Sequence, residues 1–144
     1  MAKTDYSTVC PFITVYNIET QIVFLVKVFN ASVKEQLRTP DGKINFAEVK
    51  IGDTVLMINR LSDDGKIKPS ANYVFVNDAD KIFKLAILNG GTEITKPDNK
   101  FYGIREAGFT DQQGNTWWVG EYLKDVTTKE MEAEFAKRQT KEQE

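Results

Sequence analysis

The chain has 144 residues, with 19 basic and 21 acidic side chains and a formal net charge of −2. This slightly acidic balance argues against nucleic-acid binding, because a phosphate backbone is bound through clustered Lys and Arg. The sequence contains no histidine, which excludes His-based acid–base catalysis, Ser-His-Asp and Cys-His triads and His-containing zinc sites. A single cysteine, Cys10, excludes an internal disulfide and a multi-thiolate metal site.

The first half of the chain reads as a strand, a helix and three further strands. A β-rich run over Val9–Tyr16 predicts a strand, with Pro11 near its start. Asn17 is a typical N-cap, and the apolar residues after it at helical spacing predict a helix that Asn30 ends. Three strands joined by short turns are predicted over residues 33–38, 44–51 and 54–58.

The second half repeats this pattern after a segment, Asn59–Ser70, that has the composition of a linker. A strand over residues 71–76 precedes a helix that begins after the N-cap Asp78 and stops at Gly90. Further strands are predicted over residues 92–94, 101–111 and 116–120. Both halves therefore read βαβββ.

The two halves also match by position. Val15–Glu19 matches Val76–Asp80 at an offset of 61, and Gly52–Thr54 matches Gly114–Thr116 at an offset of 62. An almost constant offset indicates a duplicated unit. Because one such unit leaves one face of its sheet uncovered, two copies are expected to pair edge to edge and curve around a shared cavity.

These patterns predict one α+β domain over residues 1–124, followed by a helical tail over residues 125–144. Its two βαβββ repeats, about 8–60 and 70–123, are expected to form a curved mixed sheet around a cavity. In the tail, Thr127 and Glu130 have the spacing of a capping box, and Met131 and Phe135 lie on one side of the expected helix. We expect this C-terminal helix to dock through those two apolar side chains.

No apolar run of a signal peptide is present, and no stretch reaches the roughly 18 apolar residues of a membrane span. The low cysteine content is typical of a reducing compartment. A cytoplasmic location without a membrane partner is therefore expected.

Four sequence runs carry a resemblance to a known family. They are Asp41–Met57 in the first half and Tyr73–Asp80, Phe101–Arg105 and Asp111–Trp117 in the second. In this order they resemble the glyoxalase/bleomycin resistance/dioxygenase group, the vicinal oxygen chelate superfamily, and within it the PhnB-like branch. The resemblance covers roughly residues 8–123. It implies the same fold, and a function among isomerases, dioxygenases, thiol transferases and binding proteins.

The resemblance also implies where a metal would be bound. Metal-dependent members take four ligands, usually His, Glu or Gln, from the first and last strands of each repeat. The matching positions here are Cys10, Leu56, Ala71 and Trp118. Leu and Ala have no lone pair to donate, Trp offers only an N–H, and one thiol does not hold a divalent ion. We therefore expect no metal and no cofactor.

Glu48 and Arg105 are the charged candidates for a site. Glu48 alternates with Phe46, opposite the apolar residues that should pack on the helices, so it is expected to face the cavity, where a carboxylate can act as a base. The alternative for Glu48 is an ion pair, with Arg105 as its partner. Arg105 can bind a ligand carboxylate or phosphate, or serve in structural pairing.

Trp118 is the aromatic candidate. Adjacent strand residues point to opposite faces, so Trp117 and Trp118 cannot share a face, and the alignment with the family implies that Trp118 is the one inside the cavity. Trp118 would form an aromatic wall with Phe12, Phe46, Tyr73 and Phe75, or would fill the cavity completely. Cys10 is either a nucleophile or, more simply, a small buried apolar residue.

The resulting hypothesis is a metal-free protein of this superfamily that binds a small organic ligand in the cavity. The candidate ligand-binding residues are Cys10, Phe46, Glu48, Leu56, Tyr73, Arg105 and Trp118. The resemblance implies a homodimer in which repeats of two chains complete the cavities. The alternative is a lyase or isomerase, either with a Glu48/Arg105 acid–base site or with a relocated metal bound by carboxylates such as Glu35, Glu48, Glu106 and Glu121. A third hypothesis is a structural or regulatory protein with a filled cavity.

Overall fold

The computed structural model describes residues 4–61 and 65–143, with side chains described as far as residue 141. Its elements are two βαβββ repeats followed by a helix, so the predicted α+β fold with a C-terminal helix is confirmed. In chain order they are β1 (Phe12–Val15), α1 (Ile18–Phe29), β2 (Ser32–Arg38), β3 (Ile44–Ile51), β4 (Thr54–Arg60), β5 (Ala71–Phe75), α2 (Ala79–Leu88), β6 (Thr92–Asn99), β7 (Ile104–Thr110), β8 (Thr116–Tyr122) and α3 (Thr128–Gln143).

Each repeat forms its own four-stranded sheet. The strand orders are β1-β4-β3-β2 in the first sheet and β5-β8-β7-β6 in the second. In both sheets the first strand runs parallel to the fourth, and the other neighbours are antiparallel. Within the described part of the chain no strand pair connects the two sheets, which differs from the edge-to-edge pairing expected from the sequence.

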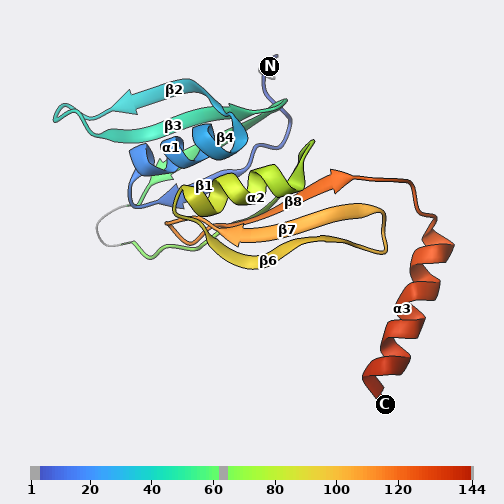
Figure 1. Cartoon of the computed structure of the whole chain (residues 1–144). Helices are drawn as coiled ribbons and strands as arrows, with labels where there is room; N and C mark the ends of the chain where they lie inside the picture. The colour runs from blue at the N-terminus through green and yellow to red at the C-terminus, as the bar shows by residue number, and fades with distance from the viewer. Residues whose placement is uncertain (1–3, 62–64, 144) are drawn as a thin grey trace.

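The two helices explain why the sheets remain separate. Figure 1 shows α1 and α2 lying next to each other between the first sheet and the second. Phe29 of α1 lies 6.2 Å from the Phe109 ring and 5.3 Å from the Trp117 ring of the second sheet, measured between centroids. One buried core therefore joins both repeats, and each sheet turns its other, helix-free face outward.

A buried polar network also joins the repeats. The Asp111 carboxylate accepts hydrogen bonds from Gln21 Nε2 of α1 and from Trp117 Nε1, both at 2.9 Å. It accepts two further bonds from the backbone N–H groups of Gln113 and Asn115. Because buried polar groups stabilise a fold only when their bonds are made, this network fixes α1 against the β7–β8 turn.

Both helices begin at the predicted caps. The side chain of Asn17 accepts a hydrogen bond from the N–H of Thr20, and that of Asp78 from the N–H of Lys81. α1 ends at Asn30, which has a left-handed backbone with φ of 55°. These contacts show why local sequence predicted the helices well.

The strand ends differ more from prediction. β1 is confined to Phe12–Val15, whereas β6 extends to Asn99 instead of ending at residue 94. β6 contains Pro97, which lacks an N–H, and this is tolerated because β6 lies at the edge of its sheet.

The helix α3 extends away from the two sheets (Figure 1). The predicted capping box is confirmed, since the N–H of Glu130 donates to Thr127 Oγ1 at 3.1 Å and the N–H of Thr127 donates to Glu130 Oε2 at 3.4 Å. The Phe135 ring lies 5.1 Å from the Phe101 ring, so the predicted docking is a small edge contact. No helix in the described ranges is long and apolar enough to cross a membrane.

Candidate ligand site on the helix-free sheet faces

Strand register assigns the candidate residues of the first sheet to its two faces. Ile13, Ile58 and Ala47 are neighbours across β1, β4 and β3, and all are buried in the core against the helices. The adjacent row alternates to the other side. The row on the helix-free face consists of Phe12, Met57 and Glu48.

The second sheet is arranged in the same way. Val119 of β8 and Ala107 of β7 are paired and buried against the helices. The alternating row of β5, β8 and β7 therefore lies on the helix-free face, and it consists of Tyr73, Trp118 and Gly108. The predicted orientations of Trp118 and Trp117, toward opposite faces, are confirmed.

Leu56 lies on the face opposite to the one expected. It pairs with Val49, is 3% exposed and belongs to the core. Because Leu56 and Trp117 both face the helices, the structural offset between β4 and β8 is 61, and the sequence match at 62 is one residue out of phase. A shift of one residue moves a strand side chain to the other face. The counterpart of Trp118 is therefore Met57.

The corrected positions do not fit the metal that the superfamily uses. They hold the thiol of Cys10, the thioether of Met57, the methyl group of Ala71 and the indole of Trp118. Two sulfur donors and two residues without a lone pair do not form a site for a hard or borderline divalent ion with open positions for substrate oxygens. Cys10 is half-buried, and its thiol donates to the Ser7 carbonyl at 3.4 Å.

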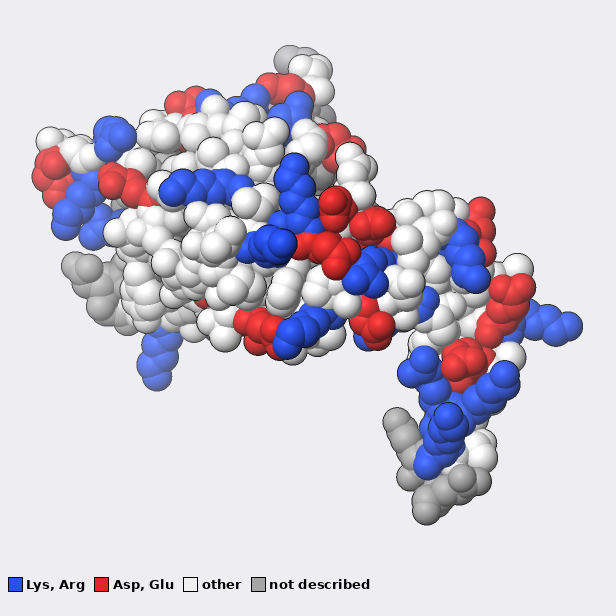
Figure 2. Space-filling model, in the orientation of Figure 1, with Lys and Arg blue, Asp and Glu red and all other residues white. Residues whose placement is uncertain are grey.

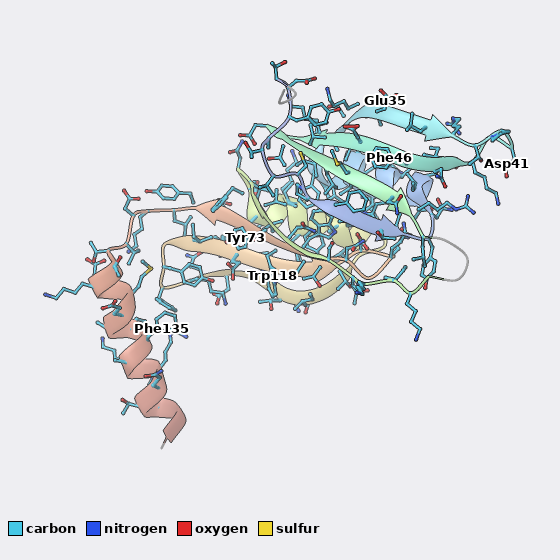
Figure 3. The ribbon with its side chains drawn as sticks, turned by 180° about the vertical axis from the view of Figure 1, so that it is seen from behind. Glu35, Asp41, Phe46, Tyr73, Trp118 and Phe135 are labelled. Atoms are coloured by element: carbon cyan, nitrogen blue, oxygen red, sulfur yellow. The ribbon has the colours of Figure 1, made fainter. Side chains whose placement is uncertain are left out.

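The helix-free face of the second sheet carries an aromatic platform, which we define as Tyr73, Phe75 and Trp118. A Cβ atom at Gly108 would lie 2.3 Å from the Trp118 ring, and one at Gly120 would lie 2.3 Å from the Tyr73 hydroxyl. Glycine at these two strand positions therefore lets both rings lie flat on the sheet. The Tyr73 and Phe75 centroids are 5.2 Å apart, and Figure 3 shows Tyr73 and Trp118 near each other on this sheet.

Glu106 adjoins this aromatic platform. Its Oε1 accepts a hydrogen bond from the Tyr73 hydroxyl at 2.8 Å, and its Oε2 accepts one from the Tyr102 hydroxyl at 2.7 Å. Burial and the bond to Glu106 raise the pKa of Tyr102 to about 12 and also raise the pKa of Tyr73. Both phenols thus remain hydrogen-bond donors, and both oxygens of Glu106 are bonded.

Glu48, which corresponds in register to Gly108, is the buried carboxylate on the helix-free face of the first sheet, and it is bonded differently from Glu106. It is 7% exposed, and its Oε2 is the one buried side-chain atom without a hydrogen-bond partner among the described residues. The Tyr6 hydroxyl bonds to the Glu48 carboxylate, which raises the pKa of Tyr6 to about 12. Tyr6 belongs to residues 4–10, the N-terminal strap, which is also held by an ion pair of 2.5 Å between Asp5 and Lys34.

Arg105 faces the helix side of its sheet. Its Nε and Nη2 bond to the two oxygens of Asp80 at 2.8 and 2.9 Å, and its Nη1 bonds to Asn99. The guanidinium lowers the pKa of the Asp80 carboxyl. The ion pair expected between Glu48 and Arg105 is therefore wrong, and the structural pairing of Arg105 is made with Asp80.

The acidic residues expected to bind a relocated cation do not converge. Among the described residues, the acidic group whose oxygens lie within 4.8 Å of one another is Asp78, Asp80 and Glu121. Asp78 caps α2, Glu121 accepts from the N–H of Ala79, and Asp80 binds Arg105. Figure 2 shows acidic side chains gathered over the start of α2 and the end of β8, and this group is explained by those bonds.

A cleft of about 600 Å³ lies between the two repeats. Leu56 and Tyr73 of the predicted set both line it, together with Pro11, Phe29 and Trp117. Residues of both repeats therefore line this cleft.

The candidate ligand-binding residues predicted from the sequence thus do not form a single site in the structure. Phe46 and Glu48 lie on the helix-free face of the first sheet, as Figure 3 shows for Phe46. The residues of these faces that the sequence reading missed are Tyr6, Met57, Tyr102, Gly108 and Gly120. The isolated glycines in strands were the available signal, because such positions often mark a close approach of another group.

The comparisons with known proteins agree with this fold. The model of the Glyoxalase/Bleomycin resistance protein/Dioxygenase superfamily matches residues 8–119. The match covers most of the chain, so the chain belongs to this superfamily.

Individual relatives add detail about the family. An uncharacterized protein of Mycobacterium bovis is 27% identical over 147 aligned positions, which cover 92% of this chain and 95% of that protein. The crystal structure of TioX from Micromonospora sp. ML1 is similar with a TM-score of 0.69 and 21% identity, covering 81% of this chain and 99% of TioX. The PhnB protein from Bacillus cereus is similar with a TM-score of 0.66 and 13% identity, covering 80% and 99% of the two chains.

Proposed function

We propose that this chain binds a small, flat organic molecule on the aromatic platform, without the help of a metal. The observation that carries the proposal is the pair of strand glycines beneath Trp118 and Tyr73. Glycine weakens a strand, so two of them beneath two rings are best explained by a use for the flat ring surface. Aromatic rings bind flat ligands by offset stacking and by burying apolar area.

We further propose a homodimer in which a second copy encloses the ligand. The helix-free faces of one chain point away from each other, because both helices lie between the sheets. These faces expose large apolar side chains, with Phe12 57%, Phe75 72% and Tyr122 58% exposed. Exposed apolar patches mark interaction surfaces. A two-fold pair that sets the first sheet of one chain over the aromatic platform of the other forms two equal cavities.

Within the superfamily we propose the PhnB-like branch and a cytoplasmic location. The four sequence runs and the fold shared with the Bacillus cereus PhnB protein support the branch. The low cysteine content supports the location. Neither proposal changes the expected site.

The test is quenching of tryptophan fluorescence by a panel of planar aromatic compounds. We expect saturable quenching in the wild type and a loss of affinity of about fivefold or more in Trp118→Ala, because stacking area is removed. Tyr16→Phe, a change at an exposed tyrosine beside the N-cap of α1, is the matched control. Absence of binding to every compound, or equal binding by Trp118→Ala, contradicts the ligand proposal.

The dimer is tested separately by sedimentation equilibrium. We expect a dimer at micromolar concentration and a weaker one in Phe75→Glu, which places a charge on the exposed platform. A monomer at these concentrations contradicts the enclosed cavity but leaves ligand binding on a single chain to be measured.

A further inference from the structure

We infer that the ligand carries a hydrogen-bond donor with positive charge, such as a protonated aromatic amine, and that Glu48 receives it. The inference rests on the proposed binding function and on the proposed homodimer, in which Glu48 of one chain faces the aromatic platform of the other, and it names the class of ligand. Its evidence is the unpartnered oxygen of Glu48 and the charges around the helix-free faces.

The unpartnered oxygen is the first step. Glu48 is buried, and its Oε2 has no hydrogen-bond partner in the described part of the chain. A buried carboxylate oxygen without a partner destabilises the free protein, because it has lost its hydration and gained no bond. Glu106 on the other helix-free face shows that the same residue type can be fully bonded in this fold. An acceptor kept open at Glu48 is suited to a donor that arrives with a ligand.

The charges near the two faces are the second step. Lys34, the cation that interacts with Glu48, is bonded to Asp5 at 2.5 Å and lies 4.9 Å from the centre of the Tyr6 ring. Arg105 is bonded to Asp80 on the helix side of the second sheet. Lys50, two residues from Glu48 on β3, is exposed on the same face. The buried polar group left for a ligand is the Glu48 carboxylate, and a carboxylate beside aromatic ring faces binds organic cations through charge-assisted hydrogen bonds and cation–π contacts.

The N-terminal strap sets the access to Glu48. The Tyr6 hydroxyl is bonded to the carboxylate and half-buried above the sheet, so a ligand donor reaches Oε2 only if the strap shifts. The strap is held by polar contacts of Asp5, Tyr6 and Cys10. Such a segment can move at a lower cost than a strand of the core.

The experiment compares two probes that share a planar tricyclic ring system and differ in charge. Proflavine, a diaminoacridine, is a planar cation at mildly alkaline pH, and acridine, without the amino groups, is uncharged there. Equilibrium dialysis of the full chain should give a preference of about tenfold or more for proflavine, the difference expected for one hydrogen bond to a charged group. Glu48→Gln should abolish that preference, because it removes the charge and keeps the shape of the side chain.

The matched control is Glu35→Gln, which removes an exposed carboxylate from the position paired with Glu48 across β2 and β3. It should retain the preference for proflavine, and melting curves should show that both variants are folded. Equal binding of the two probes by the wild type, or a preference that survives Glu48→Gln, overturns this inference while the binding function stands. Failure of the wild type to bind either probe, together with failure of the fluorescence panel, overturns the binding function itself.

Discussion

The two repeats have the same strand order, and they differ where their sheets face away from the helices. The first repeat buries Glu48 beneath the N-terminal strap and leaves one of its oxygens without a partner. The second repeat bonds both oxygens of Glu106 and lays two aromatic rings flat over glycines. The helix-facing sides of the two sheets, in contrast, share one apolar core. Duplication thus preserved the packing that holds the fold, and the helix-free faces diverged.

The hairpins between the third and fourth strands of the repeats differ too. The first repeat uses a short turn through Gly52 and Asp53, where Asp53 is exposed. The second uses a longer turn in which buried Asp111 collects four hydrogen bonds, one of them from Gln21 of the first repeat. The second hairpin therefore connects the repeats, whereas the first only reverses the chain.

The largest expected change in stability tests this difference between the hairpins. Asp111→Ala should lower the free energy of unfolding by about 3–5 kcal/mol, because it leaves several buried donors without an acceptor. Asp53→Ala, the matched change in the first hairpin, should stay within about 0.5 kcal/mol of the wild type. Urea unfolding at fixed protein concentration measures both. Equal effects of the two variants would show that Asp111 does not hold the repeats together.

The next prediction concerns the glycines of the aromatic platform. Gly108→Ala should cost about 1–3 kcal/mol, because the added Cβ meets the Trp118 ring and forces it off the strand. In a Trp118→Ala background the same change should cost much less, since the clash is gone. A double-mutant cycle by urea unfolding measures the coupling. An unchanged cost in the Trp118→Ala background would mean that the ring does not depend on Gly108.

Much of the fold could be predicted because its signals are local. Asn17 and Asp78 are caps whose side chains bond within the next three residues, and both helices begin directly after them. The strand β3 was predicted with its observed ends, because apolar alternation and turn residues at both sides mark it. The separation of the two sheets was not predicted, because it depends on how α1 and α2 pack between them.

The candidate site was harder to predict for two reasons. It depends on the exact alignment of the two repeats, and it depends on contacts between residues far apart in the sequence. One residue of error between the repeats moved Leu56 to the wrong face of its strand. Arg105 found its partner 25 residues away in α2. The bond between Tyr6 and Glu48 joins the N-terminal strap to β3, and no spacing in the sequence marks it. The orientation of Trp117 and Trp118 toward opposite faces, in contrast, was predicted correctly, because strand alternation alone decides it.

Neutralising Glu48 and neutralising Glu106 should change the free energy of unfolding in opposite directions. Glu48→Gln should raise the free energy of unfolding by about 1 kcal/mol, because it removes a buried charge with an unpartnered oxygen. Glu106→Gln should lower it by about 1 kcal/mol, because an amide has one acceptor oxygen for two tyrosine donors. Thermal unfolding of the two variants alongside the wild type measures the signs. A loss of stability in Glu48→Gln would contradict an energetically strained carboxylate in the first repeat.

The smallest expected effect is the change in stability at alkaline pH that comes from the titration of the tyrosines. The ordinary pKa of tyrosine is 10.0, and the folded protein raises that of Tyr6 and Tyr102 to about 12. A raised pKa means that folding favours the protonated phenol, so this contribution to stability is full below pH 10 and is lost as pH rises through about 12.

Spectrophotometric titration at the tyrosinate band can separate the two repeats. Glu106→Gln should lower the pKa of Tyr102 toward its ordinary value and leave Tyr6 unchanged, whereas Glu48→Gln should lower the pKa of Tyr6 and leave Tyr102 unchanged. Tyr6→Phe and Tyr102→Phe identify which step belongs to which phenol. Each glutamate variant is thus the control for the other. If either variant shifted both steps, the two carboxylates would be electrostatically coupled, and the independence of the two helix-free faces within one chain would be refuted.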